Sequence, residues 1–195
     1  MNRPTALLLF LALGLTACKR SDRPSTPVMA APVTSAPSNP SPGVPPPESL
    51  ASADAAQRIT AAQAVVAQDP KNLEAWVELG NDYFDTHQRE RAIEAYGKAL
   101  EIQPNNPNVL TDQGIMYREL GAFDRAIANF EKANAVEPAH VQSLYNLGVV
   151  YAYDLKEKEK ALKAWRRLVE VAPTSPQAAE ARQAIQALEG AQQAR

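Results

Sequence analysis

Cysteine and histidine are scarce in this chain, which contains one cysteine and two histidines among 195 residues. A single cysteine excludes an internal disulfide, so the chain must be stabilised by packing. The histidines, His87 and His140, have no Cys, Ser or acidic partner at a recognised motif spacing. The sequence therefore predicts no catalytic residue, no metal site and no cofactor, and an enzyme would need residues that only the fold brings together.

The chain also has no large excess of charge of one sign. The formal net charge is −2, and no stripe of Lys and Arg runs along the chain. Nucleic-acid-binding domains normally carry a basic patch or stripe, so we expect no nucleic-acid partner. No Gly-rich phosphate-binding loop is present either. These absences favour a binding or structural protein over an enzyme.

Long hydrophobic runs are missing too. The longest, residues 6–15, is too short to cross a bilayer as a helix, and it follows a short positive segment at Arg3. This arrangement is typical of a signal peptide. The sequence Leu-Thr-Ala-Cys at residues 15–18 resembles the lipobox of bacterial lipoproteins, in which the cysteine thiol is acylated. We therefore predict a lipoprotein signal peptide over residues 1–17 and lipidation at Cys18, with a buried or reactive thiol as the alternative.

The same resemblance implies a location. The mature chain would begin at Cys18 and would be attached to a membrane through its acylated N-terminus. Lys19 follows the cysteine, whereas lipoproteins retained in the inner membrane of enteric bacteria usually have Asp at that place. We therefore expect an exported protein that is lipid-anchored in the bacterial envelope, on the periplasmic face of the outer membrane.

Residues 18–51 have a composition of their own, dominated by Pro, Ser, Ala and Thr. Such a segment has too few large apolar residues to form a core. We predict a lipid-anchored, disordered tether that is partly extended as polyproline II. A Pro-rich ligand for a partner domain is the alternative.

The rest of the chain contains an internal repeat with a period of about 34 residues. Several residue types return together at this spacing: Pro70, Pro104, Pro138 and Pro173; Gly80, Gly114 and Gly148; Tyr83, Tyr117 and Tyr151; Ala92, Ala126 and Ala161; and the aromatic residues Tyr96, Phe130 and Trp165. Each unit has two stretches with apolar residues at helical spacing, so each predicts a pair of helices.

The repeat resembles the tetratricopeptide repeat (TPR) family, whose pattern is Trp-x2-Leu-Gly-x2-Tyr followed by Ala in a second helix. The matching positions are Trp76, Leu79, Gly80, Tyr83 and Ala92, then Gly114, Tyr117 and Ala126, then Gly148, Tyr151 and Ala161. The resemblance implies an all-α solenoid of three helix-turn-helix repeats with a capping helix at each end. The predicted boundaries are 52–72 for the N-terminal capping helix, 73–106, 107–140 and 141–175 for the repeats, and 176–195 for the C-terminal capping helix and tail.

Two structural expectations follow from the repeat. The three repeat glycines should lie where the helices of a unit cross, opposite Ala92, Ala126 and Ala161, because a small residue allows a close approach of two backbones. The third repeat is one residue longer than the others, and we expect this additional residue in its turn, within residues 154–160.

The resemblance also implies a binding face, because such solenoids usually bind on the concave face lined by the first helix of each repeat. The candidate groove residues are Glu74, Glu78, Asn81, Phe84, Asp85, Asp112, Ile115, Glu119, Tyr145, Asn146, Val149 and Tyr153. The first two repeats contribute mostly acidic residues and the third contributes aromatic and apolar ones. Chaperone-binding members hold a peptide carboxylate with lysines in the groove, which this chain lacks.

We therefore expect a protein or peptide partner that offers a basic and apolar segment or an amphipathic helix. Alternatively, the acidic residues only solvate the surface. By resemblance, the function is a scaffold or adaptor for a cell-envelope complex, such as pilus and secretin, outer-membrane or peptidoglycan machinery. A self-associating structural lipoprotein is the alternative, and an enzyme is the third and least favoured hypothesis.

Overall fold

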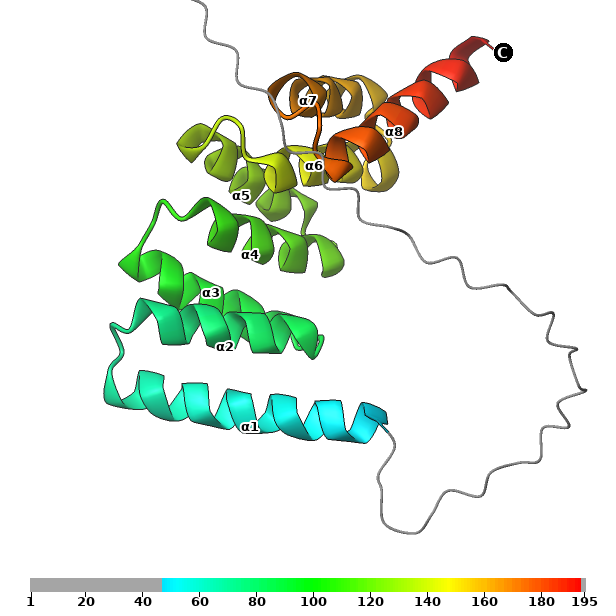
Figure 1. The fold of residues 1–195 in the computed structure, drawn as a ribbon. Coiled ribbons are helices and arrows are strands. Elements are labelled where there is room, and N and C mark those ends of the chain that lie inside the picture. The colour runs from blue at the N-terminus through cyan, green and yellow to red at the C-terminus, as the bar shows by residue number, and fades with distance from the viewer. Residues whose placement is uncertain (1–46, 194–195) are drawn as a thin grey trace, which may run out of the picture. The chain divides into compact units, whose positions relative to one another are not determined.

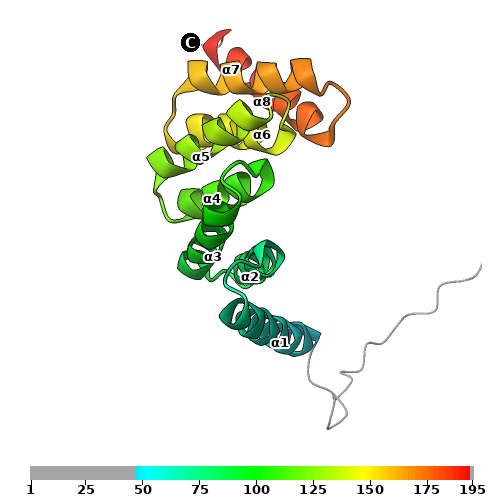
Figure 2. The same cartoon turned by 90° about the vertical axis from the view of Figure 1, so that its left-hand side faces the viewer.

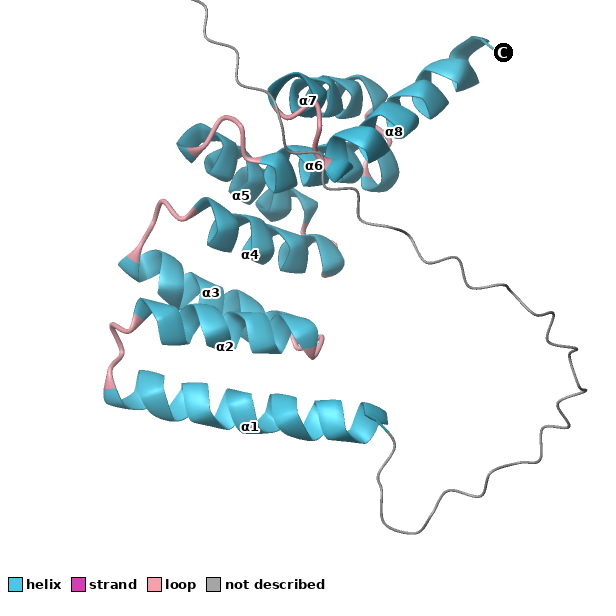
Figure 3. Ribbon diagram, viewed as in Figure 1, coloured by secondary structure: helices cyan, strands magenta, loops and turns pink. Residues whose placement is uncertain are grey.

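The computed structural model describes residues 47–193, so the predicted signal peptide, Cys18 and residues 18–46 of the predicted tether lie outside the described residues. The described part contains helices and loops but no strand (Figure 3). Its elements are α1 (Pro47–Gln68), α2 (Leu73–Asp85), α3 (Arg89–Ile102), α4 (Pro107–Glu119), α5 (Phe123–Val136), α6 (Val141–Val149), the π-helical turn η1 (Val150–Asp154), α7 (Lys158–Val171) and α8 (Pro176–Gln193). Not one of these helices is both long and apolar enough to span a membrane.

The helices pair as the repeat predicts. Each repeat contains a first helix and a second helix, namely α2 with α3, α4 with α5, and α6 and η1 with α7. Figure 1 shows the pairs stacked in chain order from α1 to α7 and α8, and Figure 2 shows the same order from the side. The predicted all-α solenoid is therefore confirmed.

The first helix of every repeat begins at the same kind of cap. The side chains of Asn72 and Asn106 accept hydrogen bonds of 3.0 and 3.2 Å from the backbone N–H groups of Ala75 and Val109. In the third repeat the imidazole of His140 takes this place. A side-chain acceptor at this position satisfies a backbone donor that the helix itself leaves unpaired.

The first helices also end alike. In each repeat the backbone carbonyl of the repeat tyrosine accepts a hydrogen bond from a backbone N–H beyond the helix, and the residue before that donor has positive φ. The pairs are Tyr83 with Gln88, Tyr117 with Ala122 and Tyr151 with Glu157, and the positive-φ residues are His87 (57°), Gly121 (74°) and Lys156 (59°). In the first two repeats this bond spans five residues, as in the Schellman motif, and in the third it spans six.

The additional residue of the third repeat lies in η1, so its predicted position in the turn is wrong. The turn itself, residues 155–157, has the same length as residues 86–88, and both have one residue of positive φ at the centre. The N–H of Leu155 instead bonds the carbonyl of Val150 at 3.0 Å, a span of π-helical type. One residue can be inserted into a helix in this way without changing the helix's partners.

The repeat glycines contact aromatic rings, each four residues after the alanine that was predicted to lie opposite the glycine. A Cβ added to Gly80 would lie 2.5 Å from the ring of Tyr96, and one added to Gly114 would lie 2.5 Å from the ring of Phe130. Gly148 has the same relationship to Trp165. All three rings are at most 1% exposed, so they form the centre of each repeat's core.

A buried polar cluster joins the second and third repeats. The Nδ1 atom of His140 accepts from the backbone N–H of Ser143 at 3.4 Å, and its Nε2–H donates to Asn108 Oδ1 at 3.0 Å. The Ser143 hydroxyl donates to Asn134 Oδ1 at 2.8 Å. Ser143 is fully buried, so its proximity to a histidine serves packing between repeats and offers no nucleophile to a substrate.

The terminal helices differ from the repeats. Helix α1 begins at Pro47, within the predicted tether, because proline is favoured in the first turn of a helix and no β-branched residue follows until Ile59. Helix α8 buries Ala178 and Ala181 against the third repeat. Its other face is exposed and mostly polar, at the positions that correspond to Trp76, Leu79, Gly80 and Tyr83: Ala179, Arg182, Gln183 and Gln186. This face gives a further helix little to pack against.

Candidate functional site

The face formed by the first helices contains a cavity of about 380 Å³. Its lining comes from all three repeats, with α2, α3, α4 and α6 each contributing: Asn81, Phe84, Asp85, Tyr96, Asp112 and Gln142. We call this cavity the groove pocket. A single bound segment in it would contact three successive repeats at once.

The groove pocket favours positive charge. Every lining side chain is acidic, amide or aromatic. Burial raises the pKa of the Asp112 carboxyl to about 6, because a carboxylate loses hydration there. Burial also raises the pKa of Tyr96, and the charges of Asp112 and Asp85 raise it further. A cation placed in the pocket would favour the ionised carboxylates.

Four of the predicted groove residues line this pocket together: Asn81, Phe84, Asp85 and Asp112. Tyr96 was not predicted as a groove residue because its ring belongs to the core. Its hydroxyl nevertheless reaches the pocket edge and donates to Asn81 Oδ1 at 2.9 Å. The sequence did contain an indication of this contact, because Tyr96 has a hydroxyl at the position where the second repeat has Phe130.

Other predicted groove residues are engaged elsewhere. Glu119 accepts from Arg89 at 2.5 Å, and the Tyr145 hydroxyl donates to Glu180 on α8 at 2.6 Å. This hydrogen bond, together with burial, raises the pKa of Tyr145 to about 12. Val149 is buried beside α8, and Ile115 packs against the core. The third repeat therefore contributes less open apolar surface than predicted, since α8 covers part of it.

The remaining predicted residues lie around the pocket without lining it. Glu74 is exposed at the start of α2, and Glu78 lines a neighbouring cavity of about 410 Å³ with Asn81 and residues of α1. Asn146 donates to the Gln142 carbonyl at 2.9 Å. Tyr153 is 55% exposed, with its ring centre 6.0 Å from that of Trp165.

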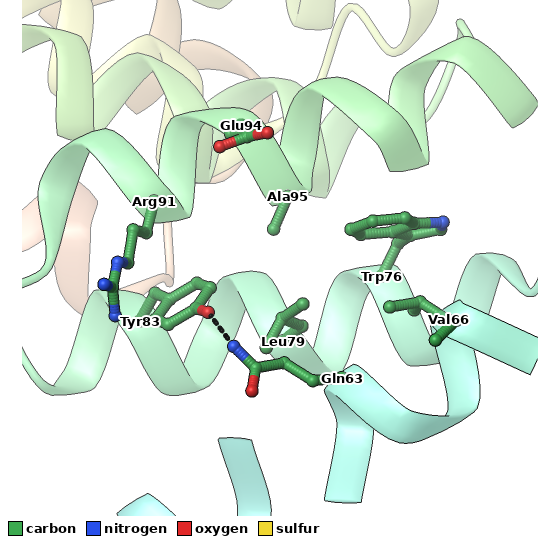
Figure 4. Close-up of a pocket in the computed structure, with 9 residues that line it drawn as sticks. Gln63, Val66, Trp76, Leu79, Tyr83, Arg91, Glu94 and Ala95 are labelled. Carbon is green, nitrogen blue, oxygen red and sulfur yellow. Dashed lines mark hydrogen bonds between the residues drawn. The ribbon is translucent and has the colours of Figure 1, made fainter. Parts of the chain in front are cut away.

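A third hollow, which was not predicted from the sequence, lies between α1, α2 and α3. Figure 4 shows it lined by Trp76, Leu79 and Tyr83 from α2, with Arg91 and Glu94 from α3. Its volume is about 410 Å³. We call it the first-repeat crevice. The Tyr83 hydroxyl accepts from Gln63 Nε2 at 2.8 Å, and the Arg91 guanidinium lies 5.7 Å from the Tyr83 ring centre, so its rim is held by contacts within the protein.

Comparison with known proteins identifies the repeat. Two family models, each described as tetratricopeptide repeat, match residues 73–106 and residues 111–179, together more than half of the chain. Among curated proteins, PEX5-related protein from Rattus norvegicus is 38% identical over 55 residues, which are 28% of this chain and 9% of that protein. Photosystem I assembly protein Ycf3 from Synechococcus sp. (strain CC9605) is 46% identical over 39 residues, 20% of this chain and 22% of that protein.

The chain thus spans less than a quarter of the length of these relatives. Among solved structures, MamA has a TM-score of 0.67 with 23% identity, covering 74% of this chain and 82% of MamA. The first TPR of Spaghetti (RPAP3), bound to the HSP90 peptide SRMEEVD, has a TM-score of 0.55 with 25% identity, covering 61% of this chain and 94% of that one. The likeness to MamA shows the fold alone.

Proposed function

Because the chain belongs to the tetratricopeptide repeat family, we propose that it is an adaptor whose groove pocket binds a basic and apolar segment of a partner protein. The family's solenoid is a scaffold for protein–protein interaction. The single observation that carries the specific proposal is the composition of the groove pocket, where two carboxylates and two aromatic rings from the first two repeats lie around one cavity with the amides of Asn81 and Gln142.

The chemistry of the pocket selects the partner's side chains. A lysine or arginine beside Asp112 and Asp85 would gain Coulomb energy at a site with reduced hydration. The Phe84 ring offers an apolar contact for the methylene groups of the same side chain or for a neighbouring apolar residue. A segment with alternating cationic and apolar residues fits both features.

The peptide bound by RPAP3 contrasts in charge with the partner segment proposed here. That TPR is bound to the peptide SRMEEVD, which is acidic at its C-terminal end. The pocket in this chain has Asn81 but carboxylates beside it, where a negative peptide would be repelled. The proposed partner segment therefore has the opposite charge.

The proposed location is the bacterial envelope, with Cys18 acylated and the protein on the periplasmic face of the outer membrane. The support is the lipobox-like sequence at residues 15–18 and Lys19 after it. An adaptor for pilus and secretin, outer-membrane or peptidoglycan machinery fits this location, and we propose that it acts without catalysis. End-to-end self-association is less compatible with the exposed, mostly polar face of α8.

Direct binding tests the groove. The probe is a fluorescein-labelled peptide of repeating Lys-Lys-Leu-Leu sequence, titrated with the purified full chain and followed by fluorescence anisotropy. We expect Asp112→Asn and Phe84→Ala each to weaken binding by roughly tenfold, about 1.4 kcal/mol. The matched control is Glu94→Gln, which also removes one negative charge but lies outside the groove pocket. Equal losses from Asp112→Asn and Glu94→Gln would show non-specific charge attraction and reject the pocket.

Cross-linking in cells then identifies the partner. A photo-reactive amino acid at Phe84 is compared with one at Lys98, which is exposed on the second helix of the same repeat. A protein captured only from Phe84, and lost on Asp112→Asn, would be the groove's partner. Capture of a second copy of this chain from Phe84 would instead favour self-association.

A further inference from the structure

A crevice between α5, α6 and α7 has a different character from the groove pocket. Its volume is about 450 Å³. Leu144, Tyr151 and Ala164 provide an apolar floor and wall, and Lys160, Lys163 and Arg167 line the α7 side. We call it the third-repeat crevice. With three cations along one side, it is the most basic of these cavities.

The repeat symmetry provides an internal comparison, because the first-repeat crevice is lined by the corresponding positions of the first repeat. Trp76 of that crevice corresponds to Leu144, and Glu94 corresponds to Lys163. Figure 4 shows the Trp76 ring beside Val66. In the third repeat a smaller leucine takes the place of the indole, and a cation takes the place of the carboxylate.

The difference in charge between the two crevices depends mainly on the position of Glu94 and Lys163. Lys160 corresponds to Arg91, and each cation lies over the repeat tyrosine, at 5.2 and 5.7 Å from the ring centre. The second repeat has Arg125 in the same relationship to Tyr117. By contrast, the residues that correspond to Lys163 are Glu94 and Ala128. Packing of the repeat therefore explains Lys160 but does not explain Lys163.

We propose that the third-repeat crevice is a second binding site, which takes an acidic amphipathic segment of a partner protein. A large apolar side chain of that segment would enter the space left by Leu144, and its carboxylates would contact Lys163, Arg167 and Lys160. The protein would then hold a basic segment in the groove pocket and an acidic one in the crevice. This inference does not rest on the proposed function of the groove pocket.

The local ion pairs are compatible with such a ligand. Arg167 Nη1 lies 2.9 Å from Glu170, and Lys160 Nζ lies 2.6 Å from Glu157. These pairs are largely exposed, and exposed pairs contribute little to stability. The partner's carboxylates can therefore replace them at small cost. Glu131 also lies on the rim and would favour a ligand whose acidic residues are placed toward α7.

The shape favours a peptide over a membrane surface. The cations line one side of a hollow between three helices, and the apolar residues lie inside it, with Leu144 only 6% exposed. A flat lipid surface could contact the lysines but could not reach the floor. Electrostatic membrane binding instead uses an exposed basic face.

The test uses a fluorescein-labelled peptide of repeating Glu-Glu-Leu-Leu sequence and the purified full chain. We expect binding that Lys163→Glu weakens by about tenfold, since the change replaces an attraction with a repulsion. Arg167→Glu should have a smaller effect in the same direction. The matched control is Lys98→Glu, because Lys98 corresponds to Arg167 and also pairs with a glutamate three residues on, at 2.9 Å. This control should leave the affinity unchanged.

A second variant tests the apolar floor. Leu144→Trp restores the indole of the first repeat and should abolish binding of the Glu-Glu-Leu-Leu peptide, while an unchanged circular dichroism spectrum and urea unfolding midpoint report that the variant is folded. Equal weakening by Lys163→Glu and Lys98→Glu would overturn the proposal. So would flotation with phosphatidylglycerol vesicles that depends on Lys163 when the acidic peptide does not bind, since that result would assign the lysines to lipid.

Discussion

The ring of Phe130 lies so close to Gly114 that a Cβ on the glycine would come within 2.5 Å of it. Gly114→Ala should therefore destabilise the protein by roughly 1–3 kcal/mol, since the ring must move within a packed core. Gly97 provides the control, because a Cβ there would have its nearest neighbour, Gln113 Nε2, at 3.6 Å. Gly97→Ala should stabilise by up to about 1 kcal/mol. Urea unfolding followed by circular dichroism measures both, and destabilisation of similar size in both variants would contradict the packing explanation.

Two of the turns between paired helices can be changed to stabilise the protein. His87 and Lys156 have positive φ, where Gly121 stands in the second repeat. A left-handed backbone costs a residue with a side chain roughly 1–2 kcal/mol. We expect His87→Gly and Lys156→Gly each to raise the free energy of unfolding by up to about 1 kcal/mol, after the entropy cost of glycine. Gly121→Ala should lower it, and a stabilising Gly121→Ala would show that these turns are not constrained.

The junction at His140 should weaken in acid. Burial lowers the pKa of His140 below 6.5, while the charge of Glu137 partly opposes this effect. As pH falls below 6.5 the unfolded chain binds a proton that the folded protein binds less readily, so stability falls with pH. Protonation would also place a positive charge at the N-terminus of α6, where the helix dipole disfavours it.

The control for this prediction comes from the other repeats, which have Asn72 and Asn106 at the same cap. His140→Asn should retain the cap and flatten the change in the free energy of unfolding between about pH 7.5 and pH 5.5. If the variant and the unmodified protein lose stability equally over that range, another group is responsible.

Asp112 should have the opposite effect on stability. Its pKa is raised from 3.8 to about 6, so between these values the folded protein binds more protons than the unfolded chain. Stability therefore falls as pH rises from 3.8 to 6, and above pH 6 the full cost remains. Asp112→Asn should stabilise the protein at neutral pH by roughly 1–3 kcal/mol and should have little effect near pH 4.

The same carboxyl links pH to binding. A cationic peptide favours ionised Asp112, so affinity for the Lys-Lys-Leu-Leu probe should rise as pH increases through 6 and then level off. In Asp112→Asn this dependence should disappear. If the affinity of the unmodified protein does not change through pH 6, Asp112 does not interact with the bound peptide.

The predicted membrane anchor can be tested by metabolic labelling. Cells supplied with an alkyne-tagged fatty acid should label this protein, and Cys18→Ser should lose all of the label because no other cysteine is present. By the lipoprotein resemblance, Lys19→Asp should move the protein from the outer-membrane to the inner-membrane fraction. Label retained by Cys18→Ser would reject Cys18 as the acylation site.

The fold was predictable because the same spacing returns in several residue types at once. Each repeat glycine, at Gly80, Gly114 and Gly148, lies three residues before a repeat tyrosine. Only a repeated helix pair accounts for this constant spacing. The position of the additional residue was not predictable. A π-helical turn at Val150–Asp154 and a longer loop give the same count of residues, and the difference lies in one hydrogen-bond span.

The site was predictable in part, for a similar reason. Positions along a helix indicate which residues face the groove, and Asn81, Phe84, Asp85 and Asp112 do line one pocket. Spacing does not report what another helix covers, so the burial of Val149 beside α8 was missed. Nor does it report how far a core side chain extends, so the hydroxyl of Tyr96 was not foreseen in the pocket.

The exposed positions Ala179, Arg182, Gln183 and Gln186 of α8 restrict how this protein can lengthen during evolution. A duplicated unit of about 34 residues placed after α8 would lack the large apolar contacts and the glycine that a neighbouring repeat uses. A unit duplicated between the second and third repeats would instead meet a repeat surface on both sides. A longer array derived from this chain should therefore have gained its units internally, on the N-terminal side of α8.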